Sequence, residues 1–393
     1  MSIEMDKATR EKKNNIEWLN DYSRAFLARG YLSKEITVEE RIRQIAEHAE
    51  TLLRKKGFAD KFYNYMSKGY YSLASPIWSN FGLSKGLPIS CFSSYVGDDM
   101  GQILFTQAEV GMMSKYGGGT SAYFGDLRPR GAPIKDNGYS SGAVHFMQLF
   151  DKLVNVVSQG AIRRGNFAAY LPIEHPDIDE FLNIGTEGNP IQGITYGVTV
   201  KDEWLQEMID GDSKKRAIWA KVLETRSQIG YPYIMFYDTV NRETVDVYKD
   251  KGLIIKSSNL CSEILLPTNE QWSFVCDLSS MNLLYYDEWK DTDAVETLVY
   301  FLDAVMNDFI IKLEELRDSG DSRKKQSFLF MERAYNFAKD NRALGLGVLG
   351  WHSLLQSKMI PIESKDAAKL NVQIFKLIKE KAYNASANLA KEY

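Results

Sequence analysis

The chain has 393 residues, of which 44% are hydrophobic and 25% are charged. This composition is typical of a globular protein with enough apolar side chains for a large core or for two or three domains. The formal net charge of −4 gives no general basic surface, so we expect neither nucleic acid nor a membrane as a partner. Three cysteines are too few for a disulfide scaffold in a chain of this length.

The N-terminal sequence, MSIEMDKATREKKNN, is charged and lacks the apolar segment of a signal peptide. The most apolar helical stretch, residues 298–316, carries five charged side chains, so it is predicted to be a buried amphipathic helix and not a membrane span. We therefore expect a cytoplasmic protein. The four histidines are scattered without metal-ligand spacing, and we expect no metal site in this chain.

The first part of the chain, to about Phe81, is predicted to be helical. Thr37 and Glu40 fit a capping box, and an apolar stripe at helical spacing follows them through residues 42–53. Gly57 is expected to end this helix.

The middle of the chain mixes strands and helices. Residues 193–200 and 231–240 are rich in β-branched and aromatic side chains, which predicts strands. Helices are predicted between them at residues 203–209 and 216–229, each followed by a glycine. This alternation favours an α/β architecture.

The last predicted helix, residues 366–393, runs to the end of the chain without a stop signal. This pattern suggests that the polypeptide was cut or that a second chain continues the fold. An ordinary C-terminal helix is the alternative.

The segment SNLCSEI, residues 258–264, groups residue types that can carry out chemistry. If it is extended, Asn259, Cys261 and Glu263 share one face, because side chains alternate along a strand. Cys91 and Cys276 each lie in a short apolar run, as buried strand residues do. The alternative is that all three cysteines are buried packing residues, and the sequence does not show whether Cys91 approaches Cys276.

Taken together, these segments resemble the large subunit of class I ribonucleotide reductases. SNLCSEI is followed by CxLSxxNL from Cys276 and preceded by SPIWSNFG at 75–82 and PISC at 88–91. SQGxxRxG and ALGLGVLG also match, in family order. The resemblance implies an α/β fold, with an N-terminal helical domain at residues 1–85. An incomplete ten-stranded α/β barrel of the ribonucleotide reductase type, lacking its C-terminal part, would follow at residues 86–393.

The resemblance also implies a reaction, the thiyl-radical reduction of ribonucleoside diphosphates to the deoxyribonucleotides used in DNA replication. Cys261 would carry the radical, Glu263 would be the base on the 3'-hydroxyl, and Asn259 would bind the sugar hydroxyls. Cys91 and Cys276 would supply the electrons and become a disulfide.

Further positions match nucleotide-binding sites of the family. One site binds the substrate, and the other binds a deoxynucleoside triphosphate or ATP, with Mg²⁺, as an allosteric effector. A specificity loop relays the identity of the effector. The matching positions are Ser75 and Ser90 for the substrate, Asp98, Ser114 and Arg128 for the effector, and Gln159 and Arg163 in the specificity loop.

Several partners are implied by the same resemblance. The radical cofactor would reside in a separate metal-bearing small subunit, with no cofactor bound covalently in this chain. Large subunits would pair as homodimers, and a thioredoxin- or glutaredoxin-type reductant would restore the thiols. No cysteine follows Cys276, so the family's C-terminal cysteine pair is absent and we expect a second chain to supply the C-terminal half.

Two other interpretations remain open. GLGVLG at 345–350 is a literal GxGxxG, which would suit an NAD-binding dehydrogenase if a strand preceded it and a helix followed. The residues before it, 333–342, look helical instead. A non-catalytic nucleotide-binding regulatory chain is the second interpretation, and the complete set of Asn259, Cys261 and Glu263 argues against it.

Overall fold

The computed structural model describes residues 16, 18–33, 35–159 and 164–393. By packing, these residues form two compact units. Unit 1 comprises the described residues of Met1–Ile89, with Asp277–Ile311 and Arg342–Tyr393. Unit 2 comprises Ser90–Cys276 and Lys312–Asn341. This division rests on packing contacts and does not test the predicted domain boundary after residue 85, which stays a prediction.

Unit 1 is mainly helical, with a short sheet in which β9 pairs antiparallel with β1 and parallel with β10. Its helices are α2 (Asp21–Ala28), α3 (Val38–Leu53), α4 (Phe58–Ser67), α5 (Ser75–Asn80), α13 (Tyr286–Trp289), the first part of α14 (Ala294–Arg317), α17 (Trp351–Ser357) and α18 (Lys365–Glu392). Its strands are β1 (Tyr71–Leu73), the second part of β9 (Phe274–Asn282) and β10 (Leu344–Leu349).

The predicted N-terminal helices are confirmed, and so is the capping box, in which Thr37 and Glu40 bond each other's backbone amides. The predicted end of α3 is wrong. The helix stops at Leu53, where Arg54 adopts the left-handed conformation, and Gly57 instead precedes α4. Strand β1 was not predicted, because three residues give no periodic signal.

Unit 2 is built on a mixed sheet. Strands β2, β3, β6, β7 and β8 are parallel in that order, and β2 also pairs antiparallel with the first part of β9. The strands are β2 (Cys91–Tyr95), β3 (Gly119–Tyr123), β6 (Phe167–Pro172), β7 (Thr195–Val200) and β8 (Tyr233–Phe236), with a separate hairpin of β4 (Pro133–Ile134) and β5 (Gly138–Tyr139). The helices are α6 (Met100–Lys115), α7 (Ala143–Val156), α8 (Ile178–Phe181), α9 (Asp202–Asp210), α10 (Ser213–Ile229), α11 (Tyr237–Glu243), α12 (Asp246–Asp250), α15 (Ser322–Leu329) and α16 (Glu332–Asn341).

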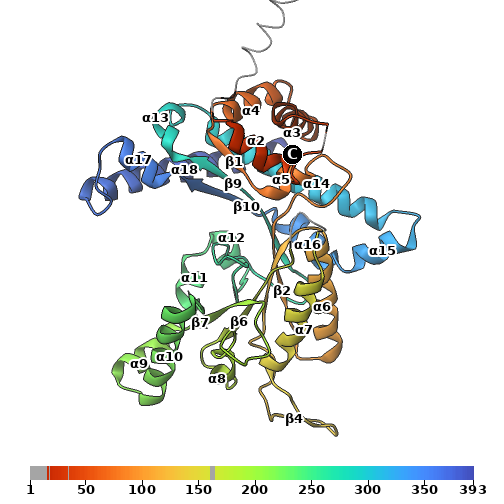
Figure 1. Ribbon diagram of the computed structural model, residues 1–393, viewed down its shortest axis with the longest axis vertical. Helices are drawn as coiled ribbons and strands as arrows, with labels where there is room; N and C mark the ends of the chain where they lie inside the picture. Colours follow the sequence, from red (N-terminus) through yellow and green to blue (C-terminus); the bar gives the residue numbers. More distant parts are fainter. Residues whose placement is uncertain (1–15, 17, 34, 160–163) are drawn as a thin grey trace, which may run out of the picture. The chain divides into compact units, whose positions relative to one another are not determined.

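Different parts of the chain cover the two faces of this sheet. Helices α6 and α7 lie side by side and cover one face (Figure 1), where alternate strand residues such as Ala122 and Phe167 join the main core. On the opposite face, Tyr123, Ala168 and Tyr170 form a small cluster with Leu260. The predicted α/β class is thus confirmed, and the face away from the helices receives the segment around Leu260.

The helices predicted before the second strand are confirmed as α9 and α10, each ended by a left-handed glycine, Gly211 or Gly230. The strand predicted at residues 231–240 is too long, because β8 ends at Phe236 and α11 begins at Tyr237. Aromatic and β-branched residues alone did not reveal this change. No helix among the described residues is both long and apolar enough to cross a membrane.

A buried ion pair joins α6 to α16 in unit 2. Arg333 donates from Nε to Glu109 Oε1 at 3.1 Å and from Nη2 to Glu109 Oε2. Ser273 Oγ also donates to Glu109, and the Glu109 side chain is fully buried. The pair therefore fixes the start of β9 as well as the two helices.

We predict that Glu109→Ala lowers the free energy of unfolding by about 3–5 kcal/mol, because it leaves the Arg333 charge buried without its partner. Urea denaturation measures the change. Glu380→Ala, which removes an exposed pair with Lys376 on α18, is the control and should have almost no effect. Equal losses in the two variants would contradict the prediction.

Candidate active site

Two of the three cysteines face each other across neighbouring strands. In the antiparallel pairing of β2 with β9, Cys91 lies directly opposite Cys276. Residues opposed in this way have Cα atoms about 4.5–5.5 Å apart and side chains on the same face. This separation lies in the range that a disulfide requires, about 4.4–6.8 Å. Both cysteines are buried.

The third cysteine lies in a turn, and the expectation of an extended segment is wrong. The amide of Ser262 donates to the carbonyl of Asn259 at 3.2 Å, and Ser262 adopts a left-handed φ of 68°. Asn259 is fully buried, whereas Cys261 and Glu263 are exposed. The three side chains therefore do not share a strand face, and their grouping depends on the turn.

Asn259 links this turn to the cysteine pair. Its Nδ2 donates to Cys91 Sγ at 3.5 Å, and its Oδ1 accepts the amide of Ile264 at 3.0 Å. Burial raises the pKa of the Cys91 thiol to about 11, with a further increase from the nearby Glu263 carboxylate and a partial decrease from the Asn259 hydrogen bond. Cys91 is thus a neutral thiol at physiological pH, and Cys261 and Glu263 lie close enough to influence it.

The two serines matched to the substrate lie in different units. Ser90 is buried beside Cys91, whose Sγ donates to Ser90 Oγ at 3.9 Å. Ser75 begins α5 in unit 1.

The effector positions are only partly brought together. Arg128 Nε donates to Asp98 Oδ2 at 2.8 Å, and its amide also bonds that carboxylate. Ser114 is buried near the far end of α6, about 20 Å from Asp98 at 1.5 Å per helical residue. Within one chain, Ser114 and Asp98 cannot contact the same small group. Gln159 packs against Gly117, and Arg163 lies outside the described residues.

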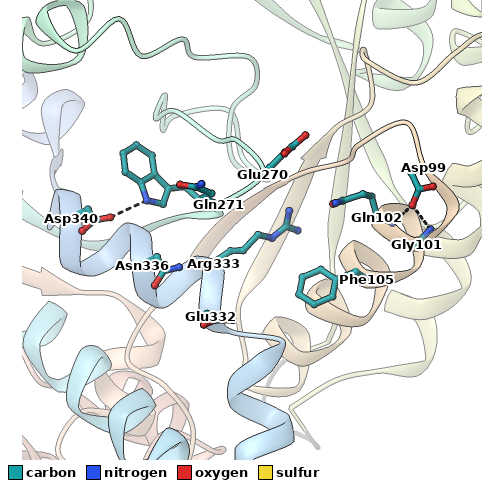
Figure 2. Close-up of a pocket in the computed structure, with 11 residues that line it drawn as sticks. Asp99, Gly101, Gln102, Phe105, Glu270, Gln271, Glu332, Arg333, Asn336 and Asp340 are labelled. Atoms are coloured by element: carbon teal, nitrogen blue, oxygen red, sulfur yellow. Dashed lines mark hydrogen bonds between the residues drawn. The ribbon is translucent and has the colours of Figure 1, made fainter.

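A pocket that the sequence did not indicate opens in unit 2, with a volume of about 590 Å³. Figure 2 shows Arg333 reaching from α16 toward Phe105, whose ring lies 5.3 Å from the guanidinium carbon. Trp272 Nε1 donates to Asp340 at 3.0 Å in the same pocket. None of the predicted site residues lines it.

Two other expectations concern metals and dinucleotides. Among the described residues, no group of three or more His, Cys, Asp or Glu side chains is placed to hold a metal ion. The GxGxxG glycines Gly345 and Gly347 lie inside strand β10, directly after helix α16, and not in a turn between a strand and a helix. This arrangement lacks the glycine turn that binds a dinucleotide pyrophosphate.

The thiols should differ in reactivity. At pH 7.5 we predict that iodoacetamide modifies Cys261 and leaves Cys91 and Cys276 unmodified, because the latter two are buried and Cys91 is protonated. Modification of Cys91 should increase as the pH rises toward 11. Peptide mass spectrometry measures each site, and unfolding in urea should expose all three. Equal modification of Cys91 and Cys261 in the folded chain would contradict this.

Comparisons with known proteins show which family this chain resembles. A family model described as "Ribonucleotide reductase, barrel domain" matches residues 89–215 and 206–393, and "Ribonucleotide reductase, all-alpha domain" matches residues 17–86. The solved structure of an Actinobacillus ureae class Id ribonucleotide reductase alpha subunit is 55% identical, with a TM-score of 0.89. That match covers 96% of this chain and 68% of the solved chain.

Two viral relatives match over most of this chain. The protein assigned as the ribonucleoside-diphosphate reductase large subunit of Frog virus 3 (isolate Goorha) is 36% identical over 86% of this chain. The ribonucleoside-diphosphate reductase large subunit of Invertebrate iridescent virus 3 is 32% identical over 81% of this chain. The matches cover 60% and 59% of those relatives, so this chain spans well under two thirds of their length.

Proposed function

Because this chain belongs to the ribonucleotide reductase large-subunit family, we propose that it carries the reaction centre for reducing ribonucleoside diphosphates to deoxyribonucleoside diphosphates. The observation that carries the proposal is the placement of Cys91 opposite Cys276, with the Asn259 amide joining the Cys261 turn to Cys91. The buried thiol pair can donate two electrons as a disulfide forms, while the exposed thiol remains separate from it.

In the proposed reaction, Cys261 is oxidised to a thiyl radical and takes the hydrogen atom from C3' of the ribose. Glu263, exposed beside it, accepts the proton of the 3'-hydroxyl. Cys91 and Cys276 together give two protons and two electrons as the two sulfurs form a disulfide. One proton leaves with the 2'-hydroxyl as water, and the other proton and the two electrons end as the new C–H bond on C2'. Cys261 then returns its hydrogen atom to C3', and Glu263 returns its proton to the 3'-oxygen.

The protonated state of Cys91 supports its role in this scheme. Because its pKa is raised to about 11, the Cys91 thiol is protonated at neutral pH and can donate a proton to the leaving hydroxyl. Asn259 does not lie beside Cys261 on a strand, because the segment forms a turn. Its side-chain amide already binds Cys91 and Ile264, so we propose that it orders the turn and the cysteine pair together.

We also propose an effector site for a deoxynucleoside triphosphate or ATP at the Asp98–Arg128 pair. Asp98 and Arg128 follow β2 and β3, and both side chains are partly exposed. A guanidinium suits phosphate binding because it donates two parallel hydrogen bonds. Ser114 could join such a site only from the second large subunit of a homodimer, and Gln159 and Arg163 would relay effector identity.

Further partners belong to the same proposal. A metal-bearing small subunit would supply the radical, and a thioredoxin- or glutaredoxin-type protein would reduce the disulfide. In unit 1, the described residues leave one edge of β10 unpaired, with Leu349 exposed, and we propose that a further strand of the barrel pairs at this edge.

Substitution of the radical thiol tests the reaction. We predict that Cys261→Ser abolishes turnover in the reconstituted assembly, because an O–H bond is too strong to exchange hydrogen with the ribose. Deoxynucleotide formation is the measurement, and a thermal melt checks that the variant folds. Turnover that survived in Cys261→Ser would exclude the radical role.

A further inference from the structure

Hydroxyl side chains from the sheet of unit 2 hold the turn that carries Cys261 by hydrogen bonds to its backbone. Ser121 Oγ on β3 donates to the carbonyl of Ser258 at 2.7 Å. Tyr170 Oη on β6 donates to the carbonyl of Asn259 at 3.0 Å. Two consecutive carbonyls, those three and two residues before Cys261, are thus held by two neighbouring strands.

The backbone of the sheet makes room for this arrangement. A Cβ atom at Gly197 would lie 2.5 Å from Cε1 of Tyr170, so only glycine lets that ring lie flat across β7. A Cβ atom at Gly119 would lie 2.9 Å from Cδ2 of Leu260, the residue before Cys261. A side chain at Gly197 would therefore force the Tyr170 ring to shift, whereas at Gly119 only the flexible end of the Leu260 side chain would have to move.

The Asn259 carbonyl has a second role, because it also accepts the amide of Ser262 and so closes the turn. Ser262 is held in a left-handed conformation that a serine rarely adopts. Such strain persists only where surrounding contacts determine the backbone fully. Burial raises the pKa of Tyr170, so its hydroxyl keeps the proton that it donates to this carbonyl.

We propose that Tyr170 is a positioning residue for Cys261, its hydroxyl fixing the turn that presents the thiol and, through Asn259, the placement of that turn on Cys91. This inference rests on the proposed role of Cys261 as the radical thiol. Tyr170 does not reach the reacting atoms itself. It acts through one backbone carbonyl.

The test compares two tyrosine-to-phenylalanine substitutions in the same sheet. Tyr170→Phe keeps the ring and removes the hydroxyl bond. Tyr196→Phe on β7 is the matched control, because the Tyr196 hydroxyl is buried and has no hydrogen-bond partner among the described residues. Both substitutions keep the buried aromatic ring, so both variants should fold. Ser121→Ala loosens the same turn from the other strand and provides a second, independent variant.

Amide hydrogen exchange over residues 260–264 is the first measurement and needs no activity. Tyr170→Phe should speed exchange there by about tenfold, the cost of one buried hydrogen bond. The second measurement is steady-state kinetics in the complete assembly. We expect kcat to fall on the order of ten- to a hundredfold, as for a displaced reacting group, with KM changed less than about twofold. Tyr196→Phe should match the wild type in both measurements.

The outcomes separate this inference from the proposed function. Wild-type exchange in Tyr170→Phe, or faster exchange with an unchanged kcat, would overturn the positioning role even if Cys261→Ser were inactive. A rise in KM as large as the expected fall in kcat would also overturn it, since Tyr170 would then act on substrate binding. Turnover retained in Cys261→Ser would remove the proposed function instead, whatever Tyr170→Phe does.

Discussion

The register of β2 against β9 is the constraint on which the candidate site depends. It places Cys91 opposite Cys276, and a slip of one residue would turn one thiol to the other face of the sheet. The parallel pairing of Cys91 with Gly119 on β3 fixes β2 from its other side. The buried Glu109–Arg333 pair anchors the start of β9 through Ser273. The geometry of the thiol pair is therefore set by contacts that take no part in chemistry.

Local signals in the sequence predicted much of the fold. The capping box at Thr37 and the glycines after α9 and α10 act within a few residues of themselves, so they could be interpreted without tertiary information. The division between β8 and α11 could not be predicted. Residues 233–240 are mostly aromatic, β-branched or otherwise apolar, which favours a strand throughout, and the helix depends on packing that a linear pattern does not contain.

The candidate site shows the same limit more sharply. The sequence drew attention to the segment around Cys261 but did not indicate its turn, because no glycine or proline marks that turn. A serine occupies the left-handed position, and distant residues such as Tyr170 and Ser121 hold it there. Cys91 and Cys276 pair across strands although they lie 185 positions apart in the chain. Hydrophobic periodicity is a local signal and cannot predict a pairing over that separation.

The exposure of Cys261 also determines which thiol is oxidised first during storage. An accessible thiol meets peroxide first, and each step beyond the sulfenic acid is irreversible without a dedicated repair enzyme. Cys91 and Cys276 are shielded by the strands that hold them. Oxidative damage is therefore expected first at Cys261, so a stored sample should lose this thiol while Cys91 and Cys276 remain intact.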